Sequence, residues 1–200
     1  MRFCRPWLII AVAAQLCGAG TPADFDRDTG PPSPLGLPSI PFPSDNPYSR
    51  ASVELGRTLF FDGRLSSNGQ VPCAACHQPE HAFSDARPFS PGVNGKLTGR
   101  HAPTLINRAW GKTEFWDGRA PSLEQQVIIP ITNPDEMGMT ADTAAQAIRT
   151  IPGYAQLFQE VYGDRTVNFD RIAKALANFV RTIVSGNSAF DHSMLETRTL

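Results

Sequence analysis

The sequence predicts a single all-α domain built from short helices and long ordered loops. Apolar residues recur at helical spacing in several segments, whereas no segment shows a strand pattern of comparable strength. The 200 residues are 41% hydrophobic and 18% charged, which is enough for a real core, and the 18 prolines and 16 glycines leave little room for long regular elements. A net charge of -1 gives no reason to expect nucleic acid or an anionic membrane surface as a partner.

The N-terminus has the pattern of a secretory signal peptide over residues 1–19. Two arginines precede an apolar run over residues 7–16, and small residues follow, so cleavage is expected after Ala19. The run is too short to cross a bilayer, which makes a permanent membrane span the weaker interpretation. Residues 20–48 are rich in proline and lack apolar periodicity, so we expect an extended leader that tethers or wraps the domain.

The first helix is expected over residues 50–61. Val53, Gly56, Leu59 and Phe60 recur at helical spacing, and Asp62-Gly63 ends the segment. Residues 66–113 then show little periodicity apart from a short helical turn over residues 73–78. A loop of that length in a compact domain is uncommon unless it wraps a ligand, so this segment is expected to surround one.

Four further helices are expected in the second half. Ser122 to Gln125 has the form of a capping box, which predicts a short helix to Ile129 that Pro130 stops. Thr140 is expected to cap a helix that runs to residue 149, and residue 152 to open another. The clearest helical pattern covers residues 170–184, where the apolar residues share one face and Gly186 is placed to end the helix.

The stretch Cys73-Ala-Ala-Cys76-His77 is the attachment pattern of c-type haem. One helical turn presents both thiols to the two vinyl groups of the porphyrin, and His77 becomes the proximal ligand of the iron. A zinc site would need a second pair of ligands of this kind, and a redox dithiol would be expected in a βαβ context that the sequence lacks. Removal of the signal peptide also leaves these as the mature chain's two cysteines, so we expect one covalent haem c.

The sixth position of the iron distinguishes an electron carrier from a peroxidase, which keeps that position open beside acid/base groups. His81 lies one turn beyond His77 on the proximal side, so it is interpreted as a surface or propionate-contacting residue. His101 lies in the long loop and remains an alternative sixth ligand. Met137 and Met139 are interpreted as core residues at the haem edge.

Five motifs occur in a fixed order along the chain. They are Leu55-Gly-Arg-Thr-Leu-Phe-Phe-Asp-Gly-Arg-Leu-Ser66, the CAACH stretch, Arg100-His-Ala-Pro-Thr-Leu-Ile-Asn107, Phe115-Trp-Asp-Gly-Arg-Ala120 and Asn133-Pro-Asp-Glu-Met137. Together they resemble the N-terminal, peroxidatic haem domain of the bacterial di-haem cytochrome c peroxidases and their MauG relatives. The likeness covers about residues 53–191, and the predicted domain covers residues 49–191 with a tail over 192–200.

The resemblance implies a cytochrome c-like fold and the reduction of hydrogen peroxide to water in the periplasm. By position, Glu136 matches the distal carboxylate, Gln126 its hydrogen-bonding companion, and Trp116 the tryptophan that passes electrons between two haems. A carboxylate beside the iron can take a proton from bound peroxide and return it to the leaving oxygen, which agrees with that role. The implied electron donor is a cytochrome c, a cupredoxin or a separate haem domain.

Two departures from the family pattern change the expectation. Many of these peroxidases place a histidine after the Ser-x-Gly turn that blocks the resting iron, but here that position is Val93, so an open or water-ligated resting haem is expected. The second haem domain of the family is missing from these 200 residues, so either the sequence is truncated or a separate cytochrome supplies the electrons. His101 stands at the position of the asparagine that usually binds calcium, which makes a calcium site doubtful. The alternative functions are a mono-haem electron-transfer protein or an inactive haem module; protein oxidation of the MauG type would need two haems.

Overall fold

The computed structural model describes residues 30–198, so the predicted signal peptide and residues 20–29 of the predicted leader lie outside the described part. Within that part, six α-helices are joined by long loops that contain five 3-10 turns and isolated β-bridges in place of strands. The prediction of an all-α class is therefore confirmed. The α-helices are α1 (Arg50–Phe60), α2 (Leu123–Thr132), α3 (Ala141–Arg149), α4 (Tyr154–Tyr162), α5 (Phe169–Arg181) and α6 (Ala189–Arg198).

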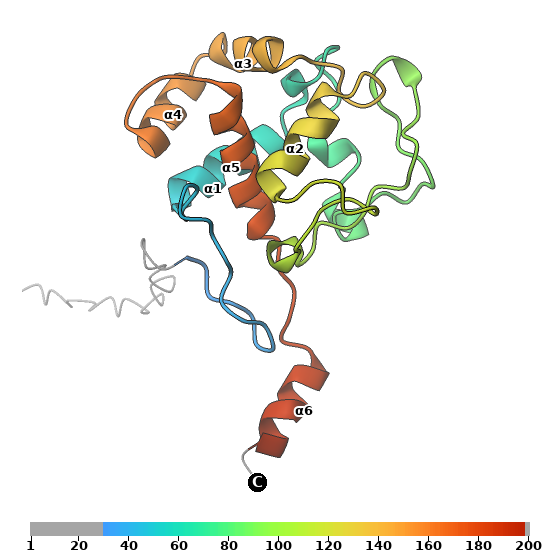
Figure 1. The fold of residues 1–200 in the computed structure, drawn as a ribbon, viewed down its shortest axis with the longest axis vertical. Coiled ribbons are helices and arrows are strands. Elements are labelled where there is room, and N and C mark those ends of the chain that lie inside the picture. The colour runs from blue at the N-terminus through green and yellow to red at the C-terminus, as the bar shows by residue number, and fades with distance from the viewer. Residues whose placement is uncertain (1–29, 199–200) are drawn as a thin grey trace, which may run out of the picture.

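The core forms where α1 and α5 cross, with α2 packed against the other side of α5 (Figure 1). Ser49 caps α1 because its hydroxyl accepts a hydrogen bond from the Ser52 N–H at 3.1 Å. Gly56 allows the two helices to approach closely, since a Cβ atom at this position would lie 1.9 Å from the Ala175 carbonyl oxygen. The glycine at position 56 of the apolar helical pattern is therefore explained by the close contact between the backbones of α1 and α5.

The prediction that Pro130 stops its helix is wrong, because α2 continues to Thr132. Proline lacks an N–H and cannot donate to the carbonyl four residues earlier, which is that of Gln126, but so near the end of a helix only this one bond is lost. Asn133 N–H still donates to the Ile129 carbonyl at 2.9 Å and closes the last turn. At the other end Ser122 accepts from the Gln125 N–H, which is one half of the predicted capping box.

The remaining helices follow the sequence with shifted ends. Thr140 caps α3 as expected, and Thr143 returns a hydrogen bond to its backbone. The helix expected at residue 152 begins at Tyr154, and α5 ends at Arg181 rather than near Gly186. No sequence signal indicated α6, which stands apart from the helical body in Figure 1.

A buried polar network ties the end of the predicted leader to the helices. The side-chain amide of Asn178, which is fully buried, donates to Asn46 Oδ1 and to Ser52 Oγ, both at 3.0 Å. Asn46 in turn donates to Glu124 Oε1 at 2.7 Å, and Arg181 holds both oxygens of that carboxylate. Residues 43–48 are thus part of the folded domain.

Among residues 30–198 no helix is long and apolar enough to cross a membrane.

Candidate haem site

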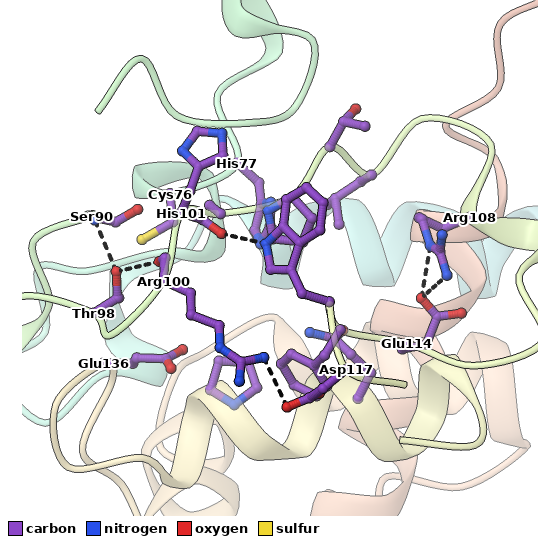
Figure 2. Close-up of a pocket in the computed structure, with 18 of the residues that line it drawn as sticks. Cys76, His77, Ser90, Thr98, Arg100, His101, Arg108, Glu114, Asp117 and Glu136 are labelled. Atoms are coloured by element: carbon purple, nitrogen blue, oxygen red, sulfur yellow. Dashed lines mark hydrogen bonds and ion pairs between the residues drawn. The ribbon is translucent and has the colours of Figure 1, made fainter. Parts of the chain in front are cut away.

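The loops between α1 and α2 enclose a cavity of about 570 Å³ against α2 and the turn that follows it. A smaller, mainly apolar cavity of about 60 Å³ adjoins it and shares six lining residues, namely Cys76, His77, Leu105, Gln126, Pro130 and Glu136. The larger volume is typical of cofactor sites. In the view of Figure 2, Cys76 and His77 lie above Glu136, with the open space between them.

The haem-attachment stretch forms a tight turn at the wall of both cavities. The structure has a 3-10 turn over η2 (Cys73–Ala75), which is shorter than the helical turn expected over residues 73–78. The His77 N–H donates to the Cys73 carbonyl at 3.0 Å, so the chain still bends back by one turn. Both thiols are free, Cys73 lines the smaller cavity, and Cys76 lines both.

His77 is oriented by a hydrogen bond from its ring to the backbone. Its Nδ1 lies 3.1 Å from the Phe83 carbonyl oxygen, and because a carbonyl can only accept, Nδ1 carries the proton in the neutral ring and Nε2 is the nitrogen that could bind a metal. A metal-binding histidine is usually held in this way. Ala82 and Phe83 both adopt the left-handed conformation, with φ of 57° and 54°, which turns the chain so that this carbonyl faces the ring.

The opposite wall is formed by Gln126 on α2 and by Glu136 in the turn after α2. Asn133 shapes this turn, since its Oδ1 accepts from the Asp135 N–H and its carbonyl accepts from the Glu136 N–H. Pro130, one turn after Gln126 on α2, also lines the cavity. An amide and a carboxylate therefore line the same cavities as His77.

The carboxyl group of Glu136 is partly shielded from water. Burial raises its pKa above the ordinary value of 4.5, and this effect outweighs the hydrogen bond that Asn133 Nδ2 donates to Oε1 at 2.8 Å. The backbone of Glu136 is fixed from behind, because its carbonyl accepts from the Val93 N–H at 2.8 Å. Gly92 is required there, since a Cβ at this position would lie 2.0 Å from the Asp135 carbonyl oxygen.

Val93 is buried beside Gly138 and is not among the residues that line the large cavity. His101, the alternative iron ligand, has both ring nitrogens engaged: Nδ1 donates to the Arg87 carbonyl at 2.7 Å, and Nε2 lies 3.1 Å from Ser84 Oγ. His101 would have to break these contacts to bind iron. His81 is exposed at the end of the turn η3 (Pro79–His81).

Trp116 lies at the mouth of the cavity and is 64% exposed. Its indole N–H donates to the His101 carbonyl at 2.9 Å. Asp117 beside it bonds both Arg100 and Arg119, and the Arg119 guanidinium lies 3.5 Å from the centre of the Phe115 ring. The tryptophan is thus oriented by its indole N–H while most of its surface faces solvent.

The residues present fit a c-type haem. Two free thiols and an imidazole line a pair of adjoining cavities, the larger of suitable size, together with the amide of Gln126 and the carboxyl group of Glu136. The predicted residues Cys73, Cys76, His77, Gln126 and Glu136 thus meet at this pair of cavities, while Trp116 stands at the mouth of the larger one.

Sequence reasoning missed the residues that support this site. The role of Asn133 could have been read from its place at the start of Asn-Pro-Asp, because asparagine side chains commonly form such turns. Arg100 and Arg119 had no local signal, since they meet Asp117 only after the loops fold. Asp85 and Ser90 had no local signal either; their Oδ2 and Oγ atoms are buried and have no hydrogen-bond partner within residues 30–198.

Comparison with known proteins gives a consistent result. Residues 50–199 match the family model described as di-haem cytochrome c peroxidase. The methylamine utilization protein MauG of Methylorubrum extorquens is 44% identical over 76% of this chain and 44% of its own length. The cytochrome c551 peroxidase of Nitrosomonas europaea is 37% identical over 77% of this chain and 46% of its own length.

Solved structures show the same relationship. The crystal structure of a MauG-like protein associated with microbial copper homeostasis superposes with a TM-score of 0.73 at 32% identity, over 81% of this chain and 50% of the other. The chain spans about half the length of these relatives.

Proposed function

Because the chain belongs to the di-haem cytochrome c peroxidase family, which implies an oxidoreductase with haem c, we propose that it acts as an exported peroxidase domain that reduces hydrogen peroxide to water. In this proposal Cys73 and Cys76 attach one haem, and His77 Nε2 binds its iron. The electrons come from a cytochrome c or a cupredoxin and pass by way of Trp116. The observation that supports the proposal is that Glu136 and Gln126 line the same two cavities as His77.

The haem, when bound, supplies the electrons and the iron that cleave the O–O bond of peroxide. Cleavage also requires that a proton move from one peroxide oxygen to the other, and the chain can provide that step. A Glu136 carboxylate oxygen accepts the proton from one oxygen of peroxide. It then donates this proton to the other oxygen, which leaves as water when the O–O bond breaks. Burial favours this role because the raised pKa of Glu136 makes its protonated form a better intermediate.

Gln126 complements the carboxylate because its amide can donate and accept hydrogen bonds without changing charge. It can therefore orient peroxide or water beside Glu136 at any pH. The apolar residues of the adjoining cavity, such as Leu105, Val127 and Met137, limit water around the reacting atoms. Asn133 completes the arrangement by fixing Glu136 Oε1.

The test is peroxide turnover by the haem-loaded protein with reduced cytochrome c, compared with Glu136→Gln. Glutamine keeps the shape but cannot carry the proton, so turnover should fall roughly 10²- to 10⁴-fold while the haem absorption spectrum is unchanged. Glu80→Gln is the matched control, because Glu80 is exposed in the turn after His77 and should leave the rate unaltered.

The outcomes separate the proposed function from its alternative. Equal rates for Glu136→Gln and the parent protein would remove Glu136 from the mechanism. No peroxide turnover in either protein, together with rapid electron exchange with cytochrome c, would favour a mono-haem electron-transfer protein.

A further inference from the structure

A buried carboxyl group lies beside the haem-attachment turn and takes no part in the proposed proton transfer. Asp85 is only 5% exposed, and its Oδ1 accepts a hydrogen bond from the Arg87 N–H at 3.0 Å. Its Oδ2 is also buried, but this oxygen has no hydrogen-bond partner within residues 30–198. Buried polar atoms almost always have a partner, so an oxygen without one requires an explanation.

The backbone fixes Asp85 next to His77. The Gln78 N–H donates to the Ser84 carbonyl at 2.9 Å, and these two residues form an isolated antiparallel bridge. In an antiparallel pairing, the residue before one partner lies across from the residue after the other, which places Asp85 across from His77. The same segment supplies the Phe83 carbonyl that orients the His77 ring.

The electrostatic effects of Asp85 agree with this placement. Burial lowers the pKa of the His77 imidazole, and the negative charge of Asp85 is among the effects that oppose this change. Burial raises the pKa of the Cys76 thiol, and Asp85 is among the charges that raise it further. The charge of Asp85 therefore acts on both residues of the turn that contact the haem in the proposed function.

No side chain of the described residues pairs with this carboxylate. Asp85 forms no ion pair with a lysine, arginine or histidine of residues 30–198, and Arg87 is exposed, so that solvent screens its charge. A water molecule can donate a hydrogen bond to Oδ2 but cannot neutralise the charge. Because residues 30–198 already cover Oδ2, a group from outside them cannot reach it unless this loop moves. An unpaired charge is costly to bury, so a positive charge is expected inside the domain.

A c-type haem would supply that charge. The porphyrin is a dianion, so its core is positive with ferric iron and neutral with ferrous iron. A negative charge close to the core attracts the ferric form and gives the ferrous form no such stabilisation. The buried carboxylate of Asp85 thus fits the cofactor in its oxidised state, and charges near a haem are one means by which a protein sets its reduction potential.

We propose that the buried carboxylate of Asp85 stabilises the oxidised haem iron and thereby lowers its reduction potential. This inference rests on the proposed function, in which Cys76 attaches the haem and His77 binds its iron. Asp85 lines neither cavity, so it acts through space and does not touch peroxide. Reduction of peroxide withdraws electrons from the iron, and a charge that stabilises the oxidised iron favours this withdrawal.

The test is a potentiometric titration of the haem-loaded protein, followed by its absorption spectrum and compared with Asp85→Asn. Asparagine keeps the oxygen that accepts from the Arg87 N–H and removes the charge. The ferrous form should gain roughly tenfold in its equilibrium with the ferric form, which raises the potential by about 59 mV for one electron. Asp85→Ser is a second neutral variant, smaller than asparagine, whose hydroxyl can still accept from this N–H. It should shift the potential in the same direction.

Two control variants separate the buried charge from other effects. Glu80→Gln removes an exposed carboxylate from the turn between His77 and Asp85, and it should change the equilibrium by less than about twofold because solvent screens this charge. Ser90→Ala removes a hydroxyl that is also buried without a partner among the described residues. Since this hydroxyl is uncharged, the change should stay below about threefold.

An unchanged or lowered potential in both neutral variants of Asp85, or an equal shift in either control, would overturn the proposal. Because no peroxide is present, the result does not depend on the role of Glu136. A protein that takes up no haem would contradict the proposed function as well. A haem-loaded protein whose potential is the same with and without the Asp85 charge would contradict this inference alone.

Discussion

Glu136 combines two demands that a proton-transfer residue must meet. Its backbone is fixed by the Val93 N–H, and its side chain is oriented by Asn133, so the carboxylate faces the cavity in one arrangement. Burial also raises its pKa above 4.5, so the group is easier to protonate than an exposed glutamate. Asn133 belongs to the motif that indicated Glu136, whereas Val93 comes from a loop far from it in the sequence.

The replacement Asn133→Asp should move the pH dependence of peroxide turnover. It keeps the Oδ1 atom that accepts from the Asp135 N–H but replaces the donor to Glu136 with a second carboxylate. The loss of the hydrogen-bond donor and the added negative charge both disfavour the charged form of Glu136, so its pKa should rise further. Because the proposed base must be deprotonated to act, activity is lost as pH falls through this pKa, and the loss should occur at higher pH in the variant.

The measurement is kcat/KM for peroxide as a function of pH, which reports groups of the free enzyme. On the acid side of the profile, kcat/KM of the variant should fall roughly tenfold for each pH unit by which the profile moves. At high pH, kcat/KM should be largely retained. Asn94→Asp, at an exposed turn, is the control. An unchanged profile in Asn133→Asp would mean that Glu136 does not set the acid side.

At the scale of the helices, the crossing of α1 and α5 depends on one missing side chain. The replacement Gly56→Ala would place a Cβ atom 1.9 Å from the Ala175 carbonyl oxygen and 2.9 Å from Phe179 Cβ. Alanine favours a helix over glycine by about 1 kcal/mol, but the two backbones must separate to admit it. Overpacking of this kind costs about 1–3 kcal/mol, so we expect net destabilisation.

Urea unfolding of the haem-loaded protein measures this effect as a lower transition midpoint for Gly56→Ala. Thr58→Ala on the exposed side of the same helix is the control and should change the free energy of unfolding by less than about 0.5 kcal/mol. If Gly56→Ala matched or exceeded the parent protein in stability, the close contact between α1 and α5 would be wrong.

The helices themselves were largely predictable because their signals are local. Ser49 and Thr140 cap helices as expected, and the apolar face of α5 follows from its spacing. Pro130 misled the prediction because a proline near the end of a helix costs only one bond, that to the Gln126 carbonyl. The helix α6 was missed because residues 189–194, the part of it whose burial the structure describes, contain no buried apolar residue, and Phe190 there is exposed.

The site was predictable where its residues form continuous motifs and not where they meet through folding. Cys73, Cys76 and His77 follow from one stretch of five residues, and Glu136 and Gln126 were identified through the family resemblance. The Phe83 carbonyl that orients His77 and the Asp117 carboxylate that joins Arg100 to Arg119 depend on the path of the loops. A single sequence carries no periodic signal for such contacts.

At the scale of the whole molecule, the two halves of the domain rest on different sources of stability. The helical half has its own core around α1 and α5 and a buried polar network that includes Asn46, Glu124 and Arg181. The loop half, residues 66–119, surrounds a cavity of about 570 Å³ and contains short 3-10 turns and isolated bridges. A covalent haem in that cavity would supply the apolar surface against which these loops pack.

Removal of the haem should therefore loosen the loop half more than the helical half. The variant Cys73→Ala with Cys76→Ala cannot form the two thioether bonds, and without the group the loops keep few buried contacts. We expect far-UV circular dichroism to retain most of its helical signal, while limited proteolysis cuts within residues 66–119. The midpoint of thermal unfolding should fall, because any group that binds only the folded state adds to its stability. The haem-loaded parent protein is the control and should resist cleavage in the same segment. Uniform loss of the helical signal in the variant would instead mean that the haem organises the whole domain, and resistance to cleavage in residues 66–119 would mean that the loops are stable without it.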